Sequence, residues 1–258
     1  MSSKQDRVFD GLAKRFQRQI YDDPRGAIRL AILQDDLAPW VLNTAPLSVL
    51  DAGAGLGQMS IWLAQQAHQV QLLEPSAEML AKAITSIEQA DLQAAIQTQQ
   101  ASIQAFCAAN TRLFDVIVCH AVLEWLAEPQ AVLAQLAVCL KPGGVLSLMF
   151  FNQHSTVMRR LIAGDLQTVS RGQFASDGNS GLAPISPLEP ETVKQWLPDL
   201  GLSLETWSGV RCFYDYMYRD VRKTAALDEV IPLERHYSRI EPWRSLARYQ
   251  HFICVKSI

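Results

Sequence analysis

The chain has 258 residues and a formal net charge of −3, and 49% of its residues are hydrophobic. These values suit one large α/β domain with a full core, and they exclude an overall basic protein that coats nucleic acid. The charged N-terminus has no signal peptide, and no apolar run is as long as a membrane span. We therefore expect a cytoplasmic protein without a membrane partner.

Charge is distributed unevenly along the chain. Residues 51–150 carry three Lys/Arg against eight Asp/Glu, whereas residues 1–50 carry seven against six and residues 151–258 carry thirteen against twelve. An anionic partner should therefore approach the flanking segments. The five cysteines form no C-x-x-C pair, so buried free thiols are expected and no metal site is predicted.

Two helices are expected before the first strand. Val8, Leu12, Phe16 and Ile20 recur every four residues and form one apolar stripe. Pro24 favours the start of a second helix, because its missing N–H is not needed in the first turn. The other faces of the first helix carry a basic set that either meets phosphates or stays solvated: Arg7, Lys14, Arg15 and Arg18.

From residue 47 strands and helices alternate. The predicted strands are 48–51, 69–73, 94–99, 116–120 and 145–151, and the predicted helices are 58–66, 77–89 and 129–140. Ser76 is a candidate cap for the helix at 77–89, and Lys141-Pro142-Gly143-Gly144 ends the helix at 129–140. Repeated units of this length imply a parallel, right-handed, doubly wound sheet.

The pattern breaks after residue 152. A loop or lid is expected over the Gly/Ser-rich residues 170–186, a helix over 190–200, a mostly helical insertion over 214–245, and strands over 202–213 and 249–255. The predicted fold is α/β, a doubly wound, Rossmann-like, mostly parallel seven-stranded sheet with N-terminal helices and a helical and loop lid. Residues 1–258 would form one domain, with a helical cap at 1–46, a cofactor-binding core at 47–151, and lid insertions and last strands at 152–258.

The stretch Asp51-Ala52-Gly53-Ala54-Gly55-Leu56-Gly57 leads directly out of the first strand. Alternating glycines let a ligand lie against bare backbone at the carboxyl end of that strand. A dinucleotide fingerprint would need glycine where Gln58 stands, which opposes an NAD dehydrogenase. The turn suits S-adenosylmethionine, whose charged amino-acid end needs a tight, open backbone turn. Glu74, at the end of the second strand, has enough acceptor sites for both ribose hydroxyls.

Three features in register resemble the class I S-adenosylmethionine-dependent methyltransferases. They are Asp51 with its glycines, Glu74, and the Lys141-Pro142-Gly143-Gly144 turn before the fifth strand. The resemblance covers about residues 47–151. It implies that the turn at 53–57 holds the methionine part of the cofactor and that Glu74 holds the ribose.

Segments outside this core resemble a narrower family, the bacterial tRNA 5-carboxymethoxyuridine methyltransferases. They include His120-Ala121-Val122-Leu123-Glu124-Trp125 and, in order along the chain, residues 7–21, 28–33, 147–152, 209–216, 241–242 and 248–249. The resemblance implies methyl transfer from S-adenosylmethionine to the carboxylate of 5-carboxymethoxyuridine at the wobble position, in the anticodon loop of tRNA. The product would be the methyl ester.

The same resemblance assigns eight residues to the cofactor: Arg29, Gly53, Ala54, Gly55, Glu74, Ile103, Gln104 and His120. Arg29 should reach the cofactor carboxylate, and Ile103 and Gln104 follow the third strand, where the adenine lies. His120 should end the fourth strand beside the sulfonium. Without the resemblance, Arg29 could be a surface helix charge and His120 a capped strand end.

Transfer to a carboxylate sets few chemical demands. The nucleophile has a pKa of roughly 4 and is already ionised near neutral pH, so no general base is predicted. The task is to align nucleophile, methyl and sulfur, with a cation holding one carboxylate oxygen and leaving the other free. Arg211 and Arg248 are the candidate anchors, with Tyr249 as a further substrate-binding residue. Alternatively, the arginines form ion pairs with nearby acids: Asp215, Glu234 or Glu241.

Several alternatives stay open at this point. An aromatic set either stacks on anticodon bases or belongs to the core: Tyr214, Tyr216, Tyr249 and Trp243. Residues 172–181 have Asp177 as their one charge, where some relatives carry a lysine run, which weakens this loop as a tRNA-gripping surface. A methyltransferase for a small carboxylic acid and a non-catalytic cofactor-binding module are the competing functions.

Overall fold

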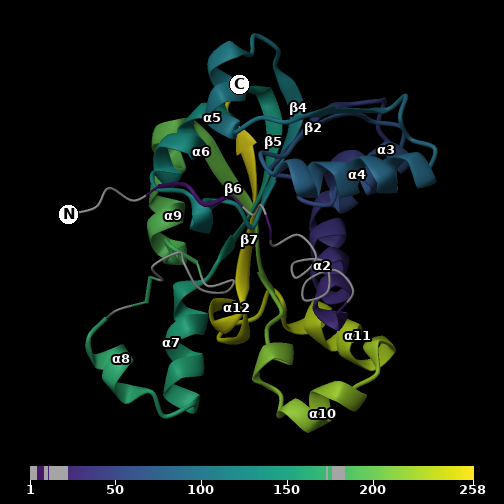
Figure 1. Ribbon diagram of the computed structural model, residues 1–258. Helices are drawn as coiled ribbons and strands as arrows, with labels where there is room; N and C mark the ends of the chain where they lie inside the picture. The colour runs from purple at the N-terminus through teal and green to yellow at the C-terminus, as the bar shows by residue number, and fades with distance from the viewer. Residues whose placement is uncertain (1–4, 9–10, 12–22, 173, 176–183) are drawn as a thin grey trace.

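A computed structural model describes residues 5–8, 11, 23–172, 174–175 and 184–258. Seven strands form one sheet in the order β3-β2-β1-β4-β5-β7-β6 (Figure 1). The strands are β1 (Ser48–Ala52), β2 (Gln69–Leu73), β3 (Ile96–Gln99), β4 (Phe114–His120), β5 (Leu140–Phe151), β6 (Leu202–Val210) and β7 (Tyr249–Lys256). Strands β1 to β5 pair in parallel, and β7 is antiparallel to both β5 and β6. The predicted doubly wound, mostly parallel sheet of seven strands is confirmed.

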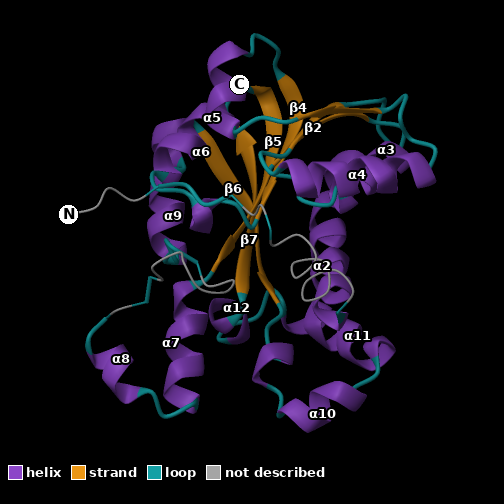
Figure 2. Ribbon diagram, in the orientation of Figure 1, coloured by secondary structure: helices purple, strands orange, loops and turns teal. Residues whose placement is uncertain are grey.

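Helices cover both faces of this sheet and extend beyond one end of it (Figure 2). The α-helices are α2 (Pro24–Val41), α3 (Gln58–Gln65), α4 (Ala77–Gln89), α5 (Ile103–Ala109), α6 (Pro129–Val138), α7 (Gln153–Ile162), α8 (Leu166–Ser170), α9 (Pro190–Trp196), α10 (Arg219–Thr224), α11 (Leu227–Tyr237) and α12 (Trp243–Leu246). Three short 3-10 turns are η2 (Leu123–Trp125), η3 (Pro198–Leu200) and η4 (Tyr214–Tyr216). Within the described ranges, no helix is both long and apolar enough to cross a membrane.

Two apolar layers hold the sheet between its helices. Successive strand residues point to opposite faces, so Val49 of β1 packs with α2, α3 and α4, whereas Leu50 packs with α5, α6 and α9. Both side chains are fully buried. Burial of one such side chain stabilises a fold by about 1.5–3 kcal/mol, so the two layers hold the strand ends in place.

The helices begin where the sequence supplies caps. The Asp23 carboxylate accepts a hydrogen bond from the Arg25 backbone N–H, and Pro24 occupies the first turn of α2. Ser76 accepts from the Met79 backbone N–H at 3.3 Å, which confirms it as the cap of α4. Each cap of this kind contributes about 1 kcal/mol and fixes the residue at which the helix leaves the sheet edge.

The structure corrects the predicted elements in three places. Ser102 caps α5, a short helix between β3 and β4 that the sequence pattern did not predict. Helices α7 and α8 follow β5 and precede most of the predicted lid at 170–186, in a stretch for which no helix was predicted. The strand expected over 202–213 ends at Val210, because Arg211 has a left-handed φ of 62° that a strand does not accommodate.

Two predicted regions lie partly or wholly outside the described residues. The predicted first helix is one, including Leu12, Phe16, Ile20 and the basic residues Lys14, Arg15 and Arg18. The middle of the predicted lid, residues 176–183, is the other.

The carboxyl ends of the parallel strands face a region bounded by several helices. Beyond these ends, α7 and α8 lie on one side and α10 and α11 on the other (Figure 1). Ligands of open α/β sheets bind outside the carboxyl ends of the strands, so this is the edge at which a functional site is expected.

Candidate active site

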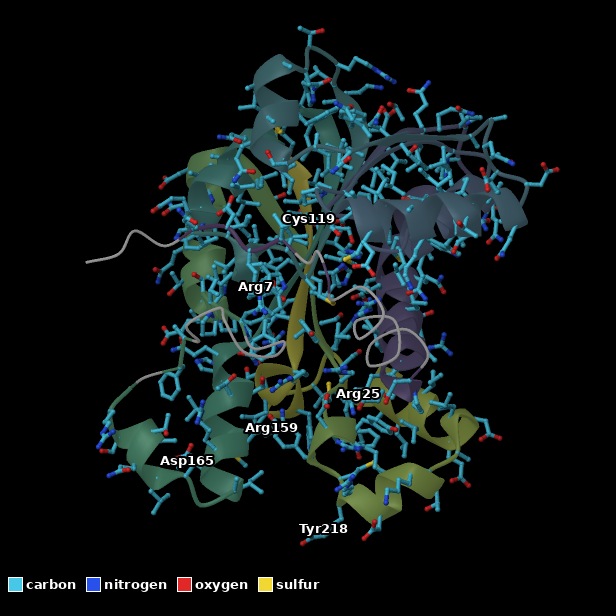
Figure 3. All side chains as sticks on the ribbon, in the orientation of Figure 1. Arg7, Arg25, Cys119, Arg159, Asp165 and Tyr218 are labelled. Atoms are coloured by element: carbon cyan, nitrogen blue, oxygen red, sulfur yellow. The ribbon has the colours of Figure 1, made fainter. Side chains whose placement is uncertain are left out.

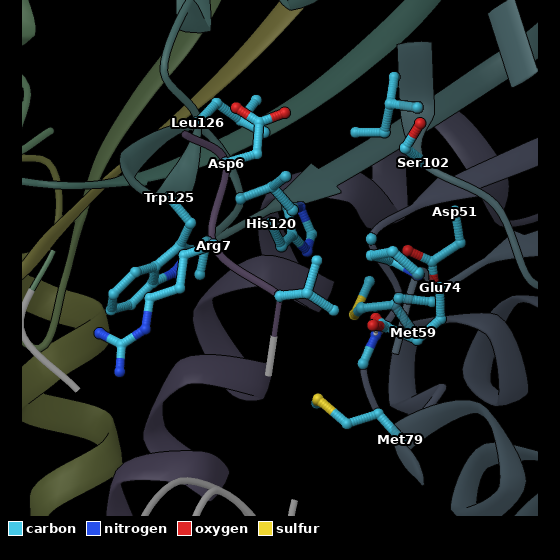
Figure 4. Close-up of a pocket in the computed structure, with 18 of the residues that line it drawn as sticks. Asp6, Arg7, Asp51, Met59, Glu74, Met79, Ser102, His120, Trp125 and Leu126 are labelled. Carbon is cyan, nitrogen blue, oxygen red and sulfur yellow. Dashed lines mark hydrogen bonds between the residues drawn. The ribbon is translucent and has the colours of Figure 1, made fainter. Parts of the chain in front are cut away.

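A pocket opens at the carboxyl ends of β1, β2 and β4 (Figure 4). It encloses about 1020 Å³ of empty space when the open solvent at its mouth is included. All eight residues predicted to hold a cofactor line it: Arg29, Gly53, Ala54, Gly55, Glu74, Ile103, Gln104 and His120. The sequence therefore identified one contiguous site from residues spread over 92 positions, from 29 to 120.

The glycine turn forms the floor of the pocket. Gly53 and Gly55 have φ values of 77° and 61°, a conformation that residues with a Cβ atom rarely adopt. A Cβ on Gly53 would lie 2.6 Å from Cγ2 of Val122, which also lines the pocket. The backbone N–H groups of Gly53 and Ala54 both donate to the Leu73 carbonyl, which ties the turn to the end of β2. Glycine at position 53 is therefore required both by the backbone conformation and by the contact.

Glu74 is the buried acid beside this turn, with 5% of its surface exposed. Its Oε2 accepts from the Gly55 backbone N–H at 2.9 Å, and its Oε1 accepts from the Ser76 backbone N–H at 2.9 Å. These two bonds fix the carboxylate in one orientation at the wall of the pocket.

Opposite charges meet at the other end of the pocket. Arg29 donates to Gln58 Oε1 at 3.2 Å, and Asp51 accepts from the Ser60 hydroxyl at 2.7 Å. Burial raises the pKa of the Asp51 carboxyl to about 6, while the Ser60 hydrogen bonds and the Arg29 charge act in the opposite direction. A buried anion near an arginine fits a ligand end that carries both an ammonium and a carboxylate.

Asp51 is a pocket residue that the sequence prediction left out of the site. Its signal was its position two residues before Gly53, which had been used only to identify the turn. Gln58 was likewise used only as evidence against a dinucleotide-binding site. In the structure it lines the pocket and accepts a hydrogen bond from Arg29. Ile103 is buried against the pocket wall at the start of α5 and supplies an apolar surface for a base.

The segment 5–8 crosses the mouth of the pocket (Figure 4). The Asp6 carboxylate accepts from the Gln104 side chain at 2.6 Å and from the Ala127 backbone N–H at 2.7 Å. The Arg7 backbone N–H donates to the Trp125 carbonyl, and the Arg7 guanidinium lies 5.5 Å from the Trp125 ring centroid. Arg7, for which phosphate contact and a solvated helix face had been left open, lines the pocket.

His120 ends β4 and points into the pocket among the labelled side chains (Figure 4). Burial holds the pKa of its imidazole well below 6.5, and the charges of His251 and Arg29 lower it further. The ring is therefore neutral at physiological pH. This is the state compatible with a positively charged sulfonium nearby.

The predicted substrate residues lie outside this pocket, further along the sheet. Phe151 pairs with Tyr249 two residues beyond the level at which Met149 pairs with His120, which is about 7 Å at ~3.3 Å per residue. The Arg211 guanidinium lies 5.2 Å from the Tyr249 ring centroid, and that of Arg248 lies 4.3 Å from the Phe151 ring centroid. Both arginines thus pack on aromatic rings at the carboxyl end of β5.

The two arginines differ in their partners. Arg211 forms an ion pair with Asp215 at 2.8 Å, and both side chains are at least nine-tenths buried. The other acids considered are occupied elsewhere, since Glu234 accepts three backbone N–H groups and Glu241 pairs with Arg244. Within the described part of the chain Arg248 makes no ion pair.

Arg248 is a cation in a partly desolvated, cation-rich place. Burial lowers the pKa of its guanidinium to about 10, and the charges of Arg159 and Arg211 act in the same direction against Asp215. It remains charged at neutral pH. A buried cation with other arginines nearby is stabilised by an incoming anion.

Most of the candidate stacking aromatics have structural contacts. Tyr214 packs in a small cluster with Ile28, the Tyr216 hydroxyl donates to the Leu246 carbonyl at 2.6 Å, and Tyr249 packs edge-on against Phe151. Trp243 is 40% exposed and is the candidate with the largest accessible face. Among the described residues, no group of three or more His, Cys, Asp or Glu is placed to hold a metal ion.

Comparisons with known proteins show methyltransferases among the relatives of this chain. A family model described as "Methyltransferase domain" matches residues 16–206. The chain is 38% identical over 254 residues to tRNA 5-carboxymethoxyuridine methyltransferase of Escherichia coli strain K12, covering 98% of this chain and 97% of that protein. It is 32% identical over 172 residues to trans-aconitate 2-methyltransferase of Deinococcus radiodurans, covering 64% and 62%. Magnesium protoporphyrin IX methyltransferase of Synechocystis PCC 6803 with bound SAH shares the fold, with a TM-score of 0.62 over 96% of both chains at 20% identity.

Proposed function

The chain belongs to the methyltransferase-domain family, in the group of the tRNA 5-carboxymethoxyuridine methyltransferases, and on that premise we propose its reaction. It transfers a methyl group from S-adenosylmethionine to the carboxylate of 5-carboxymethoxyuridine at the wobble position of tRNA, forming the methyl ester. The end-to-end likeness to the E. coli enzyme is the observation that carries this proposal. With tRNA as substrate, the enzyme acts in the cytoplasm.

The pocket fits the cofactor at each of its parts. Glu74 accepts the ribose hydroxyls, the Gly53 turn lies against the methionine part, and Ile103 supports the adenine. Asp51 and Arg29 take the ammonium and the carboxylate of the amino-acid end. When bound, the cofactor supplies a methyl group on a positively charged sulfur.

The chemistry then depends on alignment. The substrate carboxylate is ionised near neutral pH and attacks without a base, so no residue has to remove a proton. Neutral His120 places no positive charge beside the sulfonium. The protein's contribution is to hold the nucleophile in line with the methyl and the sulfur, which can supply several kcal/mol of the barrier.

Arg248 is the residue we assign to the substrate carboxylate. It is a partly buried cation without an ion pair in the described chain, whereas Arg211 is already paired with Asp215. Arg211 stacks on the ring of Tyr249. We propose that Arg211 and Tyr249 also contact the substrate, without holding its carboxylate. A single guanidinium holding one oxygen leaves the other free to attack.

The anticodon loop would enter between the helices beyond the sheet. Arg25 and Arg159 lie in that region (Figure 3). Burial raises the pKa of the Asp215 carboxyl, but the charges of Arg211 and Arg248 outweigh burial. The charges of Arg25 and Arg159 lower this pKa further. Further cations lie on helices α7 and α10 and directly after α8: Arg160, Arg171, Arg219, Arg222 and Lys223. Lys and Arg side chains of this kind bind phosphates without reading bases. In this proposal the whole chain acts as one domain, with 1–46 as cap, 47–151 as core and 152–258 carrying the substrate side.

A second candidate reaction is methylation of a small free carboxylic acid. The partial likeness to trans-aconitate 2-methyltransferase favours it, because the cofactor pocket would serve either acceptor unchanged. Labelled cofactor should be incubated with tRNA from a strain lacking this methyl transfer and, in separate reactions, with free acids that include trans-aconitate. We expect a base-labile methyl ester on tRNA. Label on the free acids alone would support the second candidate, and tight cofactor binding without any transfer would support a non-catalytic module.

A further inference from the structure

A chain of buried polar side chains crosses the sheet and ends at His120. Asp36 of α2 contacts His251 of β7, with its Oδ2 2.8 Å from Nδ1. His251 Nε2 is 2.8 Å from the Ser147 hydroxyl of β5, and the same hydroxyl is 2.8 Å from His120 Nε2. Asp36, Ser147 and His251 are at most 3% exposed. One helix and three strands therefore contribute to one continuous hydrogen-bonded path, which runs from α2 through β7 and β5 to His120 of β4 at the cofactor pocket.

The proton positions along this chain are restricted by simple counting. A serine hydroxyl has one proton to donate, so Ser147 donates to one imidazole nitrogen and accepts from the other. An ionised carboxylate only accepts, so the Nδ1 of His251 carries a proton toward Asp36. Asp36 forms an ion pair with Arg239 at 2.6 Å and accepts from the Ser208 hydroxyl at 3.0 Å, so it is ionised whatever the state of His251.

Two arrangements satisfy these contacts, and they differ by one proton on His251. If His251 is neutral, it accepts from Ser147, Ser147 accepts from His120 Nε2–H, and His120 Nδ1 carries a lone pair. If His251 is protonated, both Ser147 bonds reverse, the bond to Asp36 keeps its direction, and His120 Nδ1 carries the proton. Nδ1 of His120 is buried without a hydrogen-bond partner among the described residues, in a side chain that lines the pocket. The chain thus decides whether this ring, in the wall of the pocket, carries a lone pair or a proton at Nδ1.

We propose that Asp36, His251 and Ser147 are positioning residues that hold His120 as the Nε2–H tautomer, with a lone pair on Nδ1, in the wall of the cofactor pocket. A lone pair favours the cationic sulfonium of the cofactor over the neutral sulfur of its product. The charged and titratable groups around the pair in the described chain are Asp36 and Arg29 from α2, Arg239 after α11, and the two histidines. With Arg29 already near His120, a proton on His251 would add a second cation beside the sulfonium. This inference rests on the family's cofactor and not on the identity of the methyl acceptor.

Asp36→Asn is the sharpest perturbation, because its amide orientation is fixed by its neighbours. Oδ1 of Asp36 faces two donors, the Arg239 guanidinium at 2.6 Å and the Ser208 hydroxyl at 3.0 Å. The amide oxygen must take that place, since a guanidinium cannot accept, and the amide nitrogen then donates to His251 Nδ1. His251 becomes Nε2–H, the chain reverses, and His120 carries its proton on Nδ1.

Nitrogen NMR on protein labelled at histidine reads the tautomers directly, and the chain has five histidines to assign. We expect His120 to be protonated on Nε2 in the wild type and on Nδ1 in Asp36→Asn. A wild-type His120 protonated on Nδ1 would overturn the proposal. This spectrum decides the question even if the variant fails to fold.

Calorimetric binding of the cofactor and its demethylated product gives the second measurement. Asp36→Asn should weaken S-adenosylmethionine by about tenfold, the effect of one hydrogen-bond-scale interaction, and the product by less than about twofold. Ser147→Ala removes the hydroxyl that links His251 to His120, so it should reduce the preference for S-adenosylmethionine over its demethylated product. The matched control is Asp35→Asn, at the residue next to Asp36. It removes an exposed ion pair with Arg235 and should change neither affinity. Equal weakening of both ligands would show a merely structural role and refute the proposal, and neither experiment depends on tRNA.

Discussion

Glu74→Gln tests the cofactor pocket most economically, because both carboxylate oxygens accept from backbone N–H groups. The Gly55 N–H lies 2.9 Å from Oε2 and the Ser76 N–H lies 2.9 Å from Oε1. An amide has one oxygen, so in either orientation its NH₂ group faces a backbone N–H and one hydrogen bond is lost. Hydrogen bonds to charged groups contribute about 1.5–3 kcal/mol each, and the variant should lose about 2 kcal/mol of unfolding free energy.

Cofactor affinity should fall as well, because the ribose hydroxyls lose a charged acceptor. The same 1.5–3 kcal/mol corresponds to an increase of about 10- to 150-fold in the dissociation constant for S-adenosylmethionine. Titration calorimetry gives the affinity and urea unfolding gives the stability. Glu88→Gln, at an exposed position in the last turn of α4, is the matched control and should change neither. A folded Glu74→Gln protein that binds the cofactor within about twofold of wild type would refute the role assigned to this carboxylate.

Three further predictions use other parts of the structure. Gly53→Ala should destabilise the protein more than Gly164→Ala, measured by urea unfolding, because both have positive φ but only position 53 brings a Cβ into a 2.6 Å contact; equal losses would contradict the contact. Burial raises the pKa of the Glu124 carboxyl to about 8 from 4.5, so stability should fall by up to about 5 kcal/mol as pH rises through that interval. Glu124→Gln should abolish that fall, and an unchanged pH profile would show that the carboxyl does not titrate as described. Arg248→Gln should lower the rate of methyl transfer to tRNA by about 10- to 150-fold without changing cofactor affinity. Arg235→Gln, at an exposed ion pair, should change neither the rate nor the affinity. A wild-type rate in Arg248→Gln would exclude Arg248 as the residue that holds the substrate carboxylate.

The sheet and its ligand edge could be predicted because they depend on local patterns. Strand β2 and helix α4 have the predicted bounds, because each depends on residues within it or next to it. These are the apolar residues of β2 and the Ser76 cap of α4. Helix α7 was missed although Val157, Met158, Leu161 and Ile162 recur at helical spacing, and only Ser155 of this helix is buried. Its first turn depends on the Asn152 side chain, which accepts from the His154 backbone N–H.

The site was predictable to the extent that topology brings strand ends together. Gly53, Glu74 and His120 end neighbouring parallel strands, so their proximity follows from the fold alone. Contacts across long sequence separations had no such signal. Asp36 and His251 are 215 positions apart and meet only because β7 inserts beside β5. The pairing of Arg211 with Asp215 was one of several open alternatives, because a sequence does not show which acid turns inward.

Nucleoside mass spectrometry of the reacted tRNA tests the central claim most directly. The tRNA comes from a strain lacking this methyl transfer and is digested after incubation with the protein and S-adenosylmethionine. We predict that 5-carboxymethoxyuridine is converted to a species heavier by one methyl group in place of hydrogen, and that mild base restores the original nucleoside. Unchanged 5-carboxymethoxyuridine, or a base-stable methyl group on another nucleoside, would contradict the assignment of this chain as a tRNA carboxyl methyltransferase.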